Sequence, residues 1–352
     1  MLSFRKNLEN IPIYDGVEKN YRVKINANES TLNLPPLVEE RVFGRLSHLA
    51  FNRYPNEEYY DLIEQIAKNF SVDKSQILLG NGSSEIIEKV FQVFGGEGKK
   101  IIFPQPSFSM YKIYAKVAEA ESVIFNLDKK FDLNVDEFIK KIREENVNLA
   151  VICNPNNPTG NILSVEDIEK ILSSIDCTLL LDEAYIEFHG KSAVNLVKKY
   201  KNLIVARTFS KAYGLAGARV GYMISSKEIT DNVKKIFMPY HMNSLSLAVA
   251  DIVFQMRDEF VPRIQIAVSE RERMIKRLSE IKNLEVFPSR TNFILIRHEK
   301  ADELNEFFES LGIGVRFFKG NESLKNCLRI SIGTRAENDE VFDAMKNFLE
   351  EI

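Results

Sequence analysis

Lys211 stands out because of the residues around it. It follows Ser210 and precedes a segment rich in glycine and alanine that ends at Arg219. The apolar run 203–206 just before this segment is typical of a buried strand. A lysine at the carboxyl end of a strand is placed for covalent chemistry with a carbonyl group. The hydroxyls of Thr208 and Ser210 and the Arg219 guanidinium would hold a phosphate beside it. This combination is what pyridoxal phosphate requires of a protein.

Two other segments carry polar side chains directly after apolar runs. Residues 154–160 (Asn-Pro-Asn-Asn-Pro-Thr-Gly) follow the run 149–153, and Asp182 and Tyr185 follow another. Taken singly, the first segment is also an ordinary turn, Asp182 a helix N-cap and Lys211 a solvated surface lysine. In an open α/β sheet, however, the carboxyl ends of the strands share one crevice in which ligands bind. The three segments together therefore predict one cofactor site.

The order of the apolar runs predicts the fold around this site. About seven runs predict strands, at 77–79, 100–103, 122–127, 149–153, 177–181, 203–206 and 220–224. Segments with helical periodicity separate most of them, for example at 84–94, 136–145 and 164–173. This alternation is typical of a mostly parallel sheet with helices on both faces, so we expect an α/β fold.

The rest of the chain predicts a smaller α+β domain. Residues 259–282 carry apolar side chains at helical spacing with a charged opposite face, which predicts a long helix that connects two domains. Further strands are predicted at 284–287, 293–297, 315–318 and 327–332, and further helices at 301–311 and 337–349. We therefore expect a large domain at 46–260 and a small one at 261–352.

Composition and charge restrict the class of protein. The chain has 352 residues, of which 45% are hydrophobic and 28% charged, as in ordinary globular proteins. The net charge is −3, and no basic block suggests nucleic-acid binding. No apolar run approaches a membrane span and residues 1–12 lack the apolar core of a secretory signal, so we expect a cytoplasmic protein. The cysteines and histidines are widely spaced, so we expect no metal site.

The three polar segments, in this order, resemble those of the fold-type I aminotransferases over nearly the whole chain. Within that superfamily the sequence is most similar to the histidinol-phosphate aminotransferases. The segments that carry this closer resemblance are Asn-Ala-Asn-Glu at 26–29, Asn-Arg-Tyr-Pro at 52–55, Gly-Asn-Gly-Ser-Ser-Glu at 80–85, Asp-Glu-Ala-Tyr-Ile-Glu-Phe at 182–188 and Leu-Arg-Ile-Ser-Ile-Gly-Thr-Arg at 328–335.

The resemblance implies a reaction and an architecture. The reaction is pyridoxal-phosphate-dependent transfer of an amino group from L-histidinol phosphate to 2-oxoglutarate, which gives imidazole-acetol phosphate and L-glutamate in histidine biosynthesis. It runs in two half-reactions, a ping-pong mechanism through pyridoxamine phosphate. The N-terminal arm, residues 1–45, is expected to pack with the small domain, and the protein is expected to be a homodimer with shared active sites.

The resemblance also implies roles for the residues of the cofactor site. Lys211 bonds to the cofactor and then moves a proton between substrate and cofactor. Asp182 faces the ring nitrogen, and Tyr185 and Asn157 donate hydrogen bonds to the ring's phenolate oxygen. Phe108 stacks on the ring, at a position where the related enzymes often carry tyrosine. The cofactor phosphate is bound by a strand-to-helix turn and by hydroxyl and guanidinium groups, which are those of Ser83, Ser84, Thr208, Ser210 and Arg219.

Four more residues are assigned by resemblance. Tyr54 is expected to reach across the dimer interface to the cofactor phosphate of the neighbouring subunit. Arg329 is expected to bind the anionic group of either substrate, because a guanidinium fits both a carboxylate and a phosphate bidentately. Arg316 and Tyr14 are expected to be further contacts to the substrate phosphate.

Other functions share these motifs. An aromatic amino-acid aminotransferase, an enzyme for another small phosphorylated amine and a decarboxylase of a phosphorylated amino acid would need the same cofactor residues. A regulator that kept the fold for ligand sensing or DNA binding would not need the complete set of Lys211, Asp182, Asn157 and Tyr185. That set therefore favours an enzyme that acts on small molecules.

Overall fold

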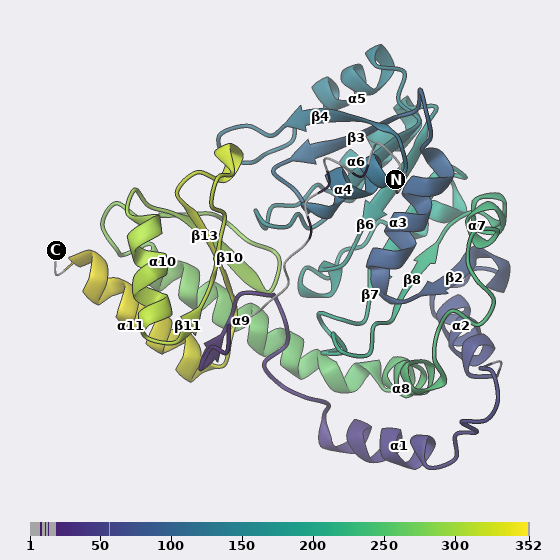
Figure 1. The fold of residues 1–352 in the computed structure, drawn as a ribbon, viewed down its shortest axis with the longest axis horizontal. Coiled ribbons are helices and arrows are strands. Elements are labelled where there is room, and N and C mark those ends of the chain that lie inside the picture. Colours follow the sequence, from purple (N-terminus) through teal and green to yellow (C-terminus); the bar gives the residue numbers. More distant parts are fainter. Residues whose placement is uncertain (1–7, 9–10, 12, 14–18, 56, 351–352) are drawn as a thin grey trace, which may run out of the picture.

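The computed structural model describes residues 8, 11, 13, 19–55 and 57–350. Its main layer is a seven-stranded sheet with the strand order β2-β8-β7-β6-β5-β3-β4 (Figure 1). The strands are Ile77–Gly80 (β2), Lys100–Gln105 (β3), Glu121–Asn126 (β4), Leu149–Cys153 (β5), Thr178–Asp182 (β6), Leu203–Thr208 (β7) and Gly221–Ile224 (β8). β8 is antiparallel to both of its neighbours, and the other neighbouring pairs are parallel. The predicted α/β fold is confirmed, and each strand lies within two residues of the apolar run that predicted it.

Alternate residues of the central strands supply the cores on the two faces of this sheet. In β5, Leu149 and Val151 belong to one cluster of buried side chains, whereas Ala150 and Ile152 belong to another. All residues of β5, β6 and β7 are buried. Strands covered on both faces are largely continuous apolar runs, which is why the sequence marks them so clearly.

Helices cover both faces of the sheet. On one face they are α3 (Gly82–Phe94), α4 (Met110–Val117) and α7 (Lys227–Lys234). On the other face they are α2 (Glu57–Phe70), α5 (Val135–Glu144), α6 (Val165–Ser174) and α8 (Ser244–Gln255). The starts of α5 and α6 are encoded locally, because the side chains of Asn134 and Ser164 accept hydrogen bonds from the N–H groups of their first turns.

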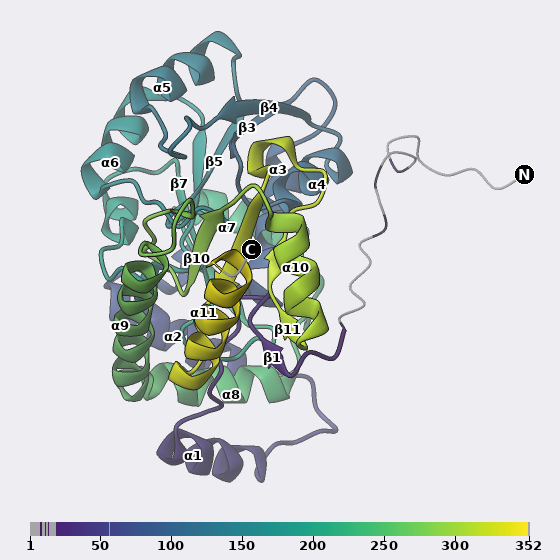
Figure 2. The ribbon, with the colours of Figure 1, turned by 90° about the vertical axis from the view of Figure 1, so that its left-hand side faces the viewer.

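A second sheet forms the core of the smaller part of the chain. Its strands are antiparallel in the order β12-β13-β10-β9, and they are Glu285–Val286 (β9), Phe293–Arg297 (β10), Arg316–Phe317 (β12) and Cys327–Ser331 (β13). α10 (Ala301–Ser310) and α11 (Arg335–Glu350) pack beside it and share its core (Figure 2). The strands and helices predicted for this region are confirmed.

The N-terminal segment contacts both parts of the chain. β1 (Val23–Lys24) pairs in parallel with β11 (Ile313–Gly314) of the smaller part. α1 (Pro36–Leu46) instead buries Val38 and Val42 in the core of the larger part, where it packs on α8 (Figure 1). The domain division at residues 46 and 260 stays a prediction. That division did not include the packing of α1 on the larger core.

α9 (Val261–Leu278) connects the two parts. Ile264 packs against the larger core, whereas Met274 and Leu278 are buried in the smaller one. The helix is shorter than the predicted span 259–282. A 3₁₀ turn precedes it, Pro262 lies in its first turn, and it ends at Leu278. Proline has no N–H to donate and is favoured at such a start.

A buried ion cluster joins the ends of β6 and β7. The Arg207 guanidinium donates to Glu183 Oε2 from Nε at 3.0 Å and from Nη2 at 2.8 Å, and Ser192 Oγ also donates to Glu183 Oε2 at 2.6 Å. Side chains alternate along a strand, so Glu183 and Arg207 lie on the opposite face from Asp182 and Thr208. The cluster therefore fixes, from behind, the two strand ends that carry the predicted cofactor residues.

Gly221 on β8 allows a close approach between this sheet and the start of α3. A Cβ atom at Gly221 would lie 2.3 Å from the backbone N of Ser83 and 2.5 Å from the carbonyl carbon of Gly82. We predict that Gly221→Ala lowers the free energy of unfolding by about 1–3 kcal/mol, because backbone atoms must move to relieve the overlap. Thermal and denaturant unfolding would measure the change.

Gly217→Ala is the matched control, because a Cβ atom there has no neighbour within 4 Å. An unfolding midpoint of Gly221→Ala equal to that of the control would contradict the proposed close packing.

Candidate functional site

Lys211 lies in the loop after β7, with its amine buried between the two parts of the chain. Its Nζ donates a hydrogen bond to the carbonyl oxygen of Ala27 at 3.0 Å. The same atom lies 5.9 Å from the centre of the Tyr185 ring. Burial, followed by the positive charge of Arg329, lowers the pKa of Lys211 to about 8. An amine with a pKa this close to neutral is uncharged in a fraction of the molecules at neutral pH, and the uncharged form is the one that both a nucleophile and a general base require.

Asp182 ends β6 and is buried, at 4% exposure. Its Oδ2 accepts a hydrogen bond from Tyr111 Oη at 2.8 Å, and its Oδ1 accepts one from the N–H of Ala184 at 3.1 Å. Burial raises the pKa of Asp182 to about 6, although both hydrogen bonds oppose this shift. A carboxylate held in this way has fixed oxygens and would respond strongly to a nearby positive charge.

Tyr111 was not singled out in the sequence. It is fully buried in α4 and its ring meets Phe108 edge to face, with centroids 5.5 Å apart. Its spacing of three residues from Phe108 in the segment that starts a helix is the one sequence feature that places both rings on the same side. Phe108 itself is partly buried beside the same cluster of side chains.

The predicted phosphate-binding groups converge where β2 and β7 end. Thr208 Oγ1 lies 3.0 Å from Ser210 Oγ, and Arg219 Nη1 donates to Ser210 Oγ at 3.4 Å. Ser83 and Ser84 stand in the first turn of α3, whose first residue, Gly82, has φ +78°. A Cβ atom at Gly82 would lie 2.7 Å from Arg219 Nη2, so the helix start and the guanidinium are neighbours.

The smaller part of the chain reaches the site through Arg329. Its Nη1 donates to Asn157 Oδ1 at 2.6 Å, and its Nη2 donates to the carbonyl oxygen of Asn26 at 2.7 Å. Asn28 donates from Nδ2 to Tyr185 Oη at 3.0 Å. Asn26 and Asn28 were quoted only as part of a family segment, and nothing in their spacing assigned them contacts with this site.

Two predicted residues are exposed rather than buried with this cluster. Tyr54 is 76% exposed and stacks on Tyr240, with ring centroids 4.6 Å apart. Arg316 is exposed on β12, directly opposite Arg329 in the strand register. Tyr14 lies outside the described residues.

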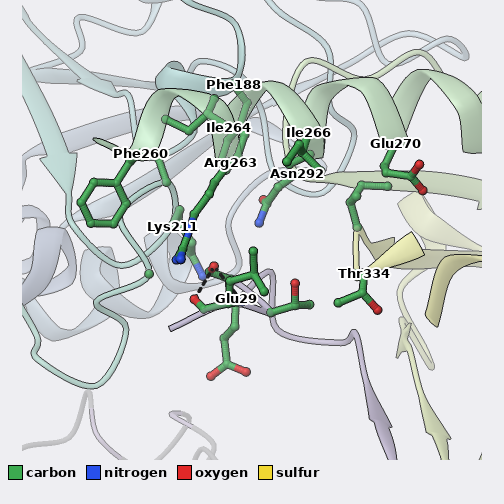
Figure 3. Close-up of a pocket in the computed structure, with 18 of the residues that line it drawn as sticks. Glu29, Phe188, Lys211, Phe260, Arg263, Ile264, Ile266, Glu270, Asn292 and Thr334 are labelled. Atoms are coloured by element: carbon green, nitrogen blue, oxygen red, sulfur yellow. Dashed lines mark hydrogen bonds between the residues drawn. The ribbon is translucent and has the colours of Figure 1, made fainter. Parts of the chain in front are cut away.

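A cavity of about 350 Å³ borders Lys211 on the side of α9 (Figure 3). Its walls come from α9, from residues 29–32 and from residues 332–335. Figure 3 shows Arg263 extending from α9 toward Lys211, with Glu29 on the opposite wall. None of the other predicted cofactor residues lines it, so the cavity lies next to Lys211 but apart from the phosphate-binding groups.

The groups around Lys211 fit pyridoxal phosphate. Two hydroxyls, a guanidinium and a helix N-terminus are the donors that a phosphate dianion prefers. The buried Asp182 carboxylate is suited to a protonated ring nitrogen, and the buried amine of Lys211 is suited to an aldehyde. Gly82 leaves the space that a larger residue would fill beside Arg219.

Two structural features are absent from the described part of the chain. Within it, no three His, Cys, Asp or Glu side chains are grouped so that they could hold a metal ion. Nor does any helix there have the length and apolar character that crossing a membrane requires.

Comparisons with known proteins identify the family of the chain. Residues 23–345 match the family model described as aminotransferase class I and II. The histidinol-phosphate aminotransferase of Clostridium novyi is 37% identical over 343 residues, which cover 97% of this chain and 96% of that protein.

Solved structures lead to the same family. The crystal structure of the histidinol-phosphate aminotransferase from Clostridium acetobutylicum has a TM-score of 0.87 and 27% identity, and the match covers 94% of this chain and 100% of that one. The Sinorhizobium meliloti histidinol-phosphate aminotransferase, solved in complex with pyridoxal-5'-phosphate, has the same fold, with a TM-score of 0.87 at 22% identity and coverage of 99% and 98%. The chain therefore belongs to the class I and II aminotransferases, and within them to the histidinol-phosphate aminotransferases.

Proposed function

We propose that this protein transfers the amino group of L-histidinol phosphate to 2-oxoglutarate, in the cytoplasm and with pyridoxal phosphate as its cofactor. The observation that carries the proposal is the convergence of a half-buried lysine, a buried carboxylate and a phosphate-binding turn at neighbouring strand ends. The similarity over nearly the whole chain to histidinol-phosphate aminotransferases supports the choice of substrate. When bound, pyridoxal phosphate accepts the amino group and stabilises the negative charge that develops at the substrate Cα.

Lys211 is proposed to hold the cofactor and then to move a proton. Its amine lies between the Ala27 carbonyl and the Tyr185 ring. Rotation about the bonds of the lysine side chain would move the amine within the site. Because burial brings its pKa to about 8, the amine can accept a proton from the substrate Cα and release it again near neutral pH.

Asp182 is proposed to face the cofactor's ring nitrogen. Tyr111 and the Ala184 N–H hold its two oxygens in place. A positive charge beside Asp182 would keep its carboxyl ionised, and the ionised carboxylate in turn would hold a proton on the ring nitrogen. Ser83, Ser84, Thr208, Ser210 and Arg219 are proposed to bind the phosphate.

Arg329 and Arg316 are proposed to recognise the substrate's anionic group. Directly opposed residues of an antiparallel pair lie on the same face of a sheet, so both guanidiniums face the same side of β12 and β13. The buried Arg329 would bind the carboxylate of glutamate or the phosphate of histidinol phosphate, and the exposed Arg316 would add a contact to the phosphate. Tyr14 is proposed as a third contact to the phosphate.

A homodimer is proposed on the basis of an exposed apolar surface, which we term the α1–α2–α8 surface. It gathers large hydrophobic side chains from α1, α2, α8 and the loops beside them, which are Leu37, Phe43, Phe51, Tyr54, Tyr60, Met238, Tyr240 and Leu245. These helices lie together at the lower edge of the molecule in Figure 1 and Figure 2. Soluble monomers rarely expose large contiguous apolar patches. A second copy of the chain would cover this surface and would receive Tyr54 at its own cofactor.

We predict that Lys211→Ala loses turnover by at least about 10²-fold, because no other amine replaces its proton transfer. The purified variant should still bind pyridoxal phosphate, but dialysis should remove it, and after dialysis the variant should lack the visible absorbance that the wild-type protein keeps. Absorbance spectra and half-reaction rates would measure both effects. Lys201→Ala, at an exposed lysine, is the control. Wild-type turnover in Lys211→Ala would remove Lys211 from the mechanism.

We predict that the two arginines differ in selectivity. Arg329→Leu should weaken glutamate and histidinol phosphate alike, whereas Arg316→Leu should weaken mainly histidinol phosphate. Each lost charge-assisted bond should cost about 1.5–3 kcal/mol, or roughly ten- to a hundredfold in affinity. Half-reaction rates with glutamate, histidinol phosphate and phenylalanine as amino donors would test this. The proposed substrate would be wrong if the wild-type protein preferred phenylalanine.

We predict that the wild-type protein sediments as a dimer and that Tyr54→Ala retains cofactor less well on dilution, because the variant lacks the proposed contact from the partner. Sedimentation and cofactor retention would be measured over a range of protein concentrations. Leu311→Ala, at an exposed apolar residue of the smaller part, is the control. A monomer with full activity would contradict the shared active site.

A further inference from the structure

Asn28 links three segments of the chain in the interior of the protein. It is 1% exposed, and its backbone has φ 54°, in the left-handed region. Its N–H donates to Ser331 Oγ on β13 at 2.9 Å, and its carbonyl oxygen accepts from Asn292 Nδ2 at 3.1 Å. Its side chain reaches Tyr185, which belongs to the larger part. Asparagine is among the few residues that tolerate this backbone conformation without a large strain.

The Ser331 hydroxyl determines which way the Asn28 amide points. Ser331 Oγ accepts the backbone N–H of Asn28 and lies 3.0 Å from Asn28 Oδ1. In the part of the chain that the structure describes, Asn28 Oδ1 is the only acceptor for the hydroxyl hydrogen of Ser331. The side-chain oxygen of Asn28 is therefore turned toward Ser331, and its NH₂ group is turned toward Tyr185.

This orientation determines the direction of the hydrogen bond between Asn28 and the Tyr185 hydroxyl. Tyr185 Oη accepts a hydrogen bond from Asn28 Nδ2 at 3.0 Å. A hydroxyl that accepts from one side keeps its own hydrogen for another partner. Tyr185 is 4% exposed, and among the described residues no acceptor for this hydrogen is present. A buried donor without an acceptor is costly, so the arrangement fits an acceptor that arrives with a ligand.

We propose that Asn28 is a positioning residue that makes Tyr185 a hydrogen-bond donor to the phenolate oxygen of pyridoxal phosphate. The inference rests on the proposed function, because it takes that cofactor as the ligand. Since Asn28 is itself held by Ser331 on β13, the smaller part of the chain takes part in setting this hydrogen bond. An amide oxygen in place of the NH₂ group would accept the Tyr185 hydrogen and remove the donor.

Two substitutions separate this role from a structural one. Asn28→Gly removes the amide but suits the left-handed backbone. Asn28→Asp keeps the shape and the acceptor for Ser331, but its ionised carboxylate presents an oxygen to Tyr185, which would then donate to that oxygen. We expect Asn28→Gly to weaken pyridoxal phosphate binding to the cofactor-free protein about three- to tenfold, and Asn28→Asp to weaken it more.

The pH dependence of the visible absorbance of the bound cofactor provides a second measurement. A donor to the phenolate oxygen stabilises its negative charge, so loss of that donor raises the pH at which the absorbance changes. We expect this rise to be larger for Asn28→Asp than for Asn28→Gly. A residue that served only the fold would give the opposite order, because aspartate is the closer match in shape.

A double-mutant cycle with Tyr185→Phe tests the route of the effect. In that background the substitutions at Asn28 should change neither cofactor affinity nor the absorbance titration further. Asn283, an exposed asparagine with φ 61°, provides the control substitutions Asn283→Gly and Asn283→Asp, which should leave both measurements unchanged. If Asn28→Asp does not fold, Ser331→Ala releases the amide instead, and its smaller effect should also disappear with Tyr185→Phe.

The outcomes are distinct. Equal effects of Asn28→Gly and Asn28→Asp, or an Asn28→Asp effect that persists with Tyr185→Phe, would overturn the inference about Asn28. A wild-type protein that binds no pyridoxal phosphate would overturn the proposed function itself.

Discussion

Burial of charged groups between two cores is the constraint on which the site depends. Lys211 and Asp182 are both removed from water, which lowers the pKa of the amine to about 8 and raises that of the carboxyl to about 6. Each group is thereby brought close to neutral pH, where both protonation states are accessible. Neither shift would arise on the surface, so the chemistry requires the packed sheet on one side and the smaller part of the chain on the other.

The two faces of the sheet contribute different groups to this arrangement. On one face of β6 and β7, Asp182 and Thr208 point to the site, while on the other face Glu183 and Arg207 form a buried ion pair. Breaking such a pair by removing one partner strongly destabilises a protein, because a buried charge is left uncompensated. The strand ends that carry the reactive groups are thus held from behind.

The N-terminal segment completes the site from the opposite direction. The backbone carbonyl oxygens of Asn26 and Ala27 accept from Arg329 and Lys211, and the Asn28 side chain reaches Tyr185. Three consecutive residues therefore contact groups from both parts of the chain. β13 of the smaller part supplies Arg329 and Ser331 to these contacts. A movement of the smaller part relative to the sheet would therefore change them.

The sequence alone determined the order of strands and helices and the identity of most of the reactive side chains. Buried parallel strands are continuous apolar runs, so β5 could be predicted from its own residues. Helix caps depend on a few adjacent residues, so the start of α6 could be predicted in the same way. Asp182 was found because it directly follows an apolar run, and Lys211 because it lies a few residues after one. The tertiary structure decided what no local pattern contains. Tyr111 meets Asp182 across 71 positions, and Asn28 meets Tyr185 across 157. The direction of a hydrogen bond, the pKa of a buried group and the packing of α1 on the larger core depend on groups that only folding brings together.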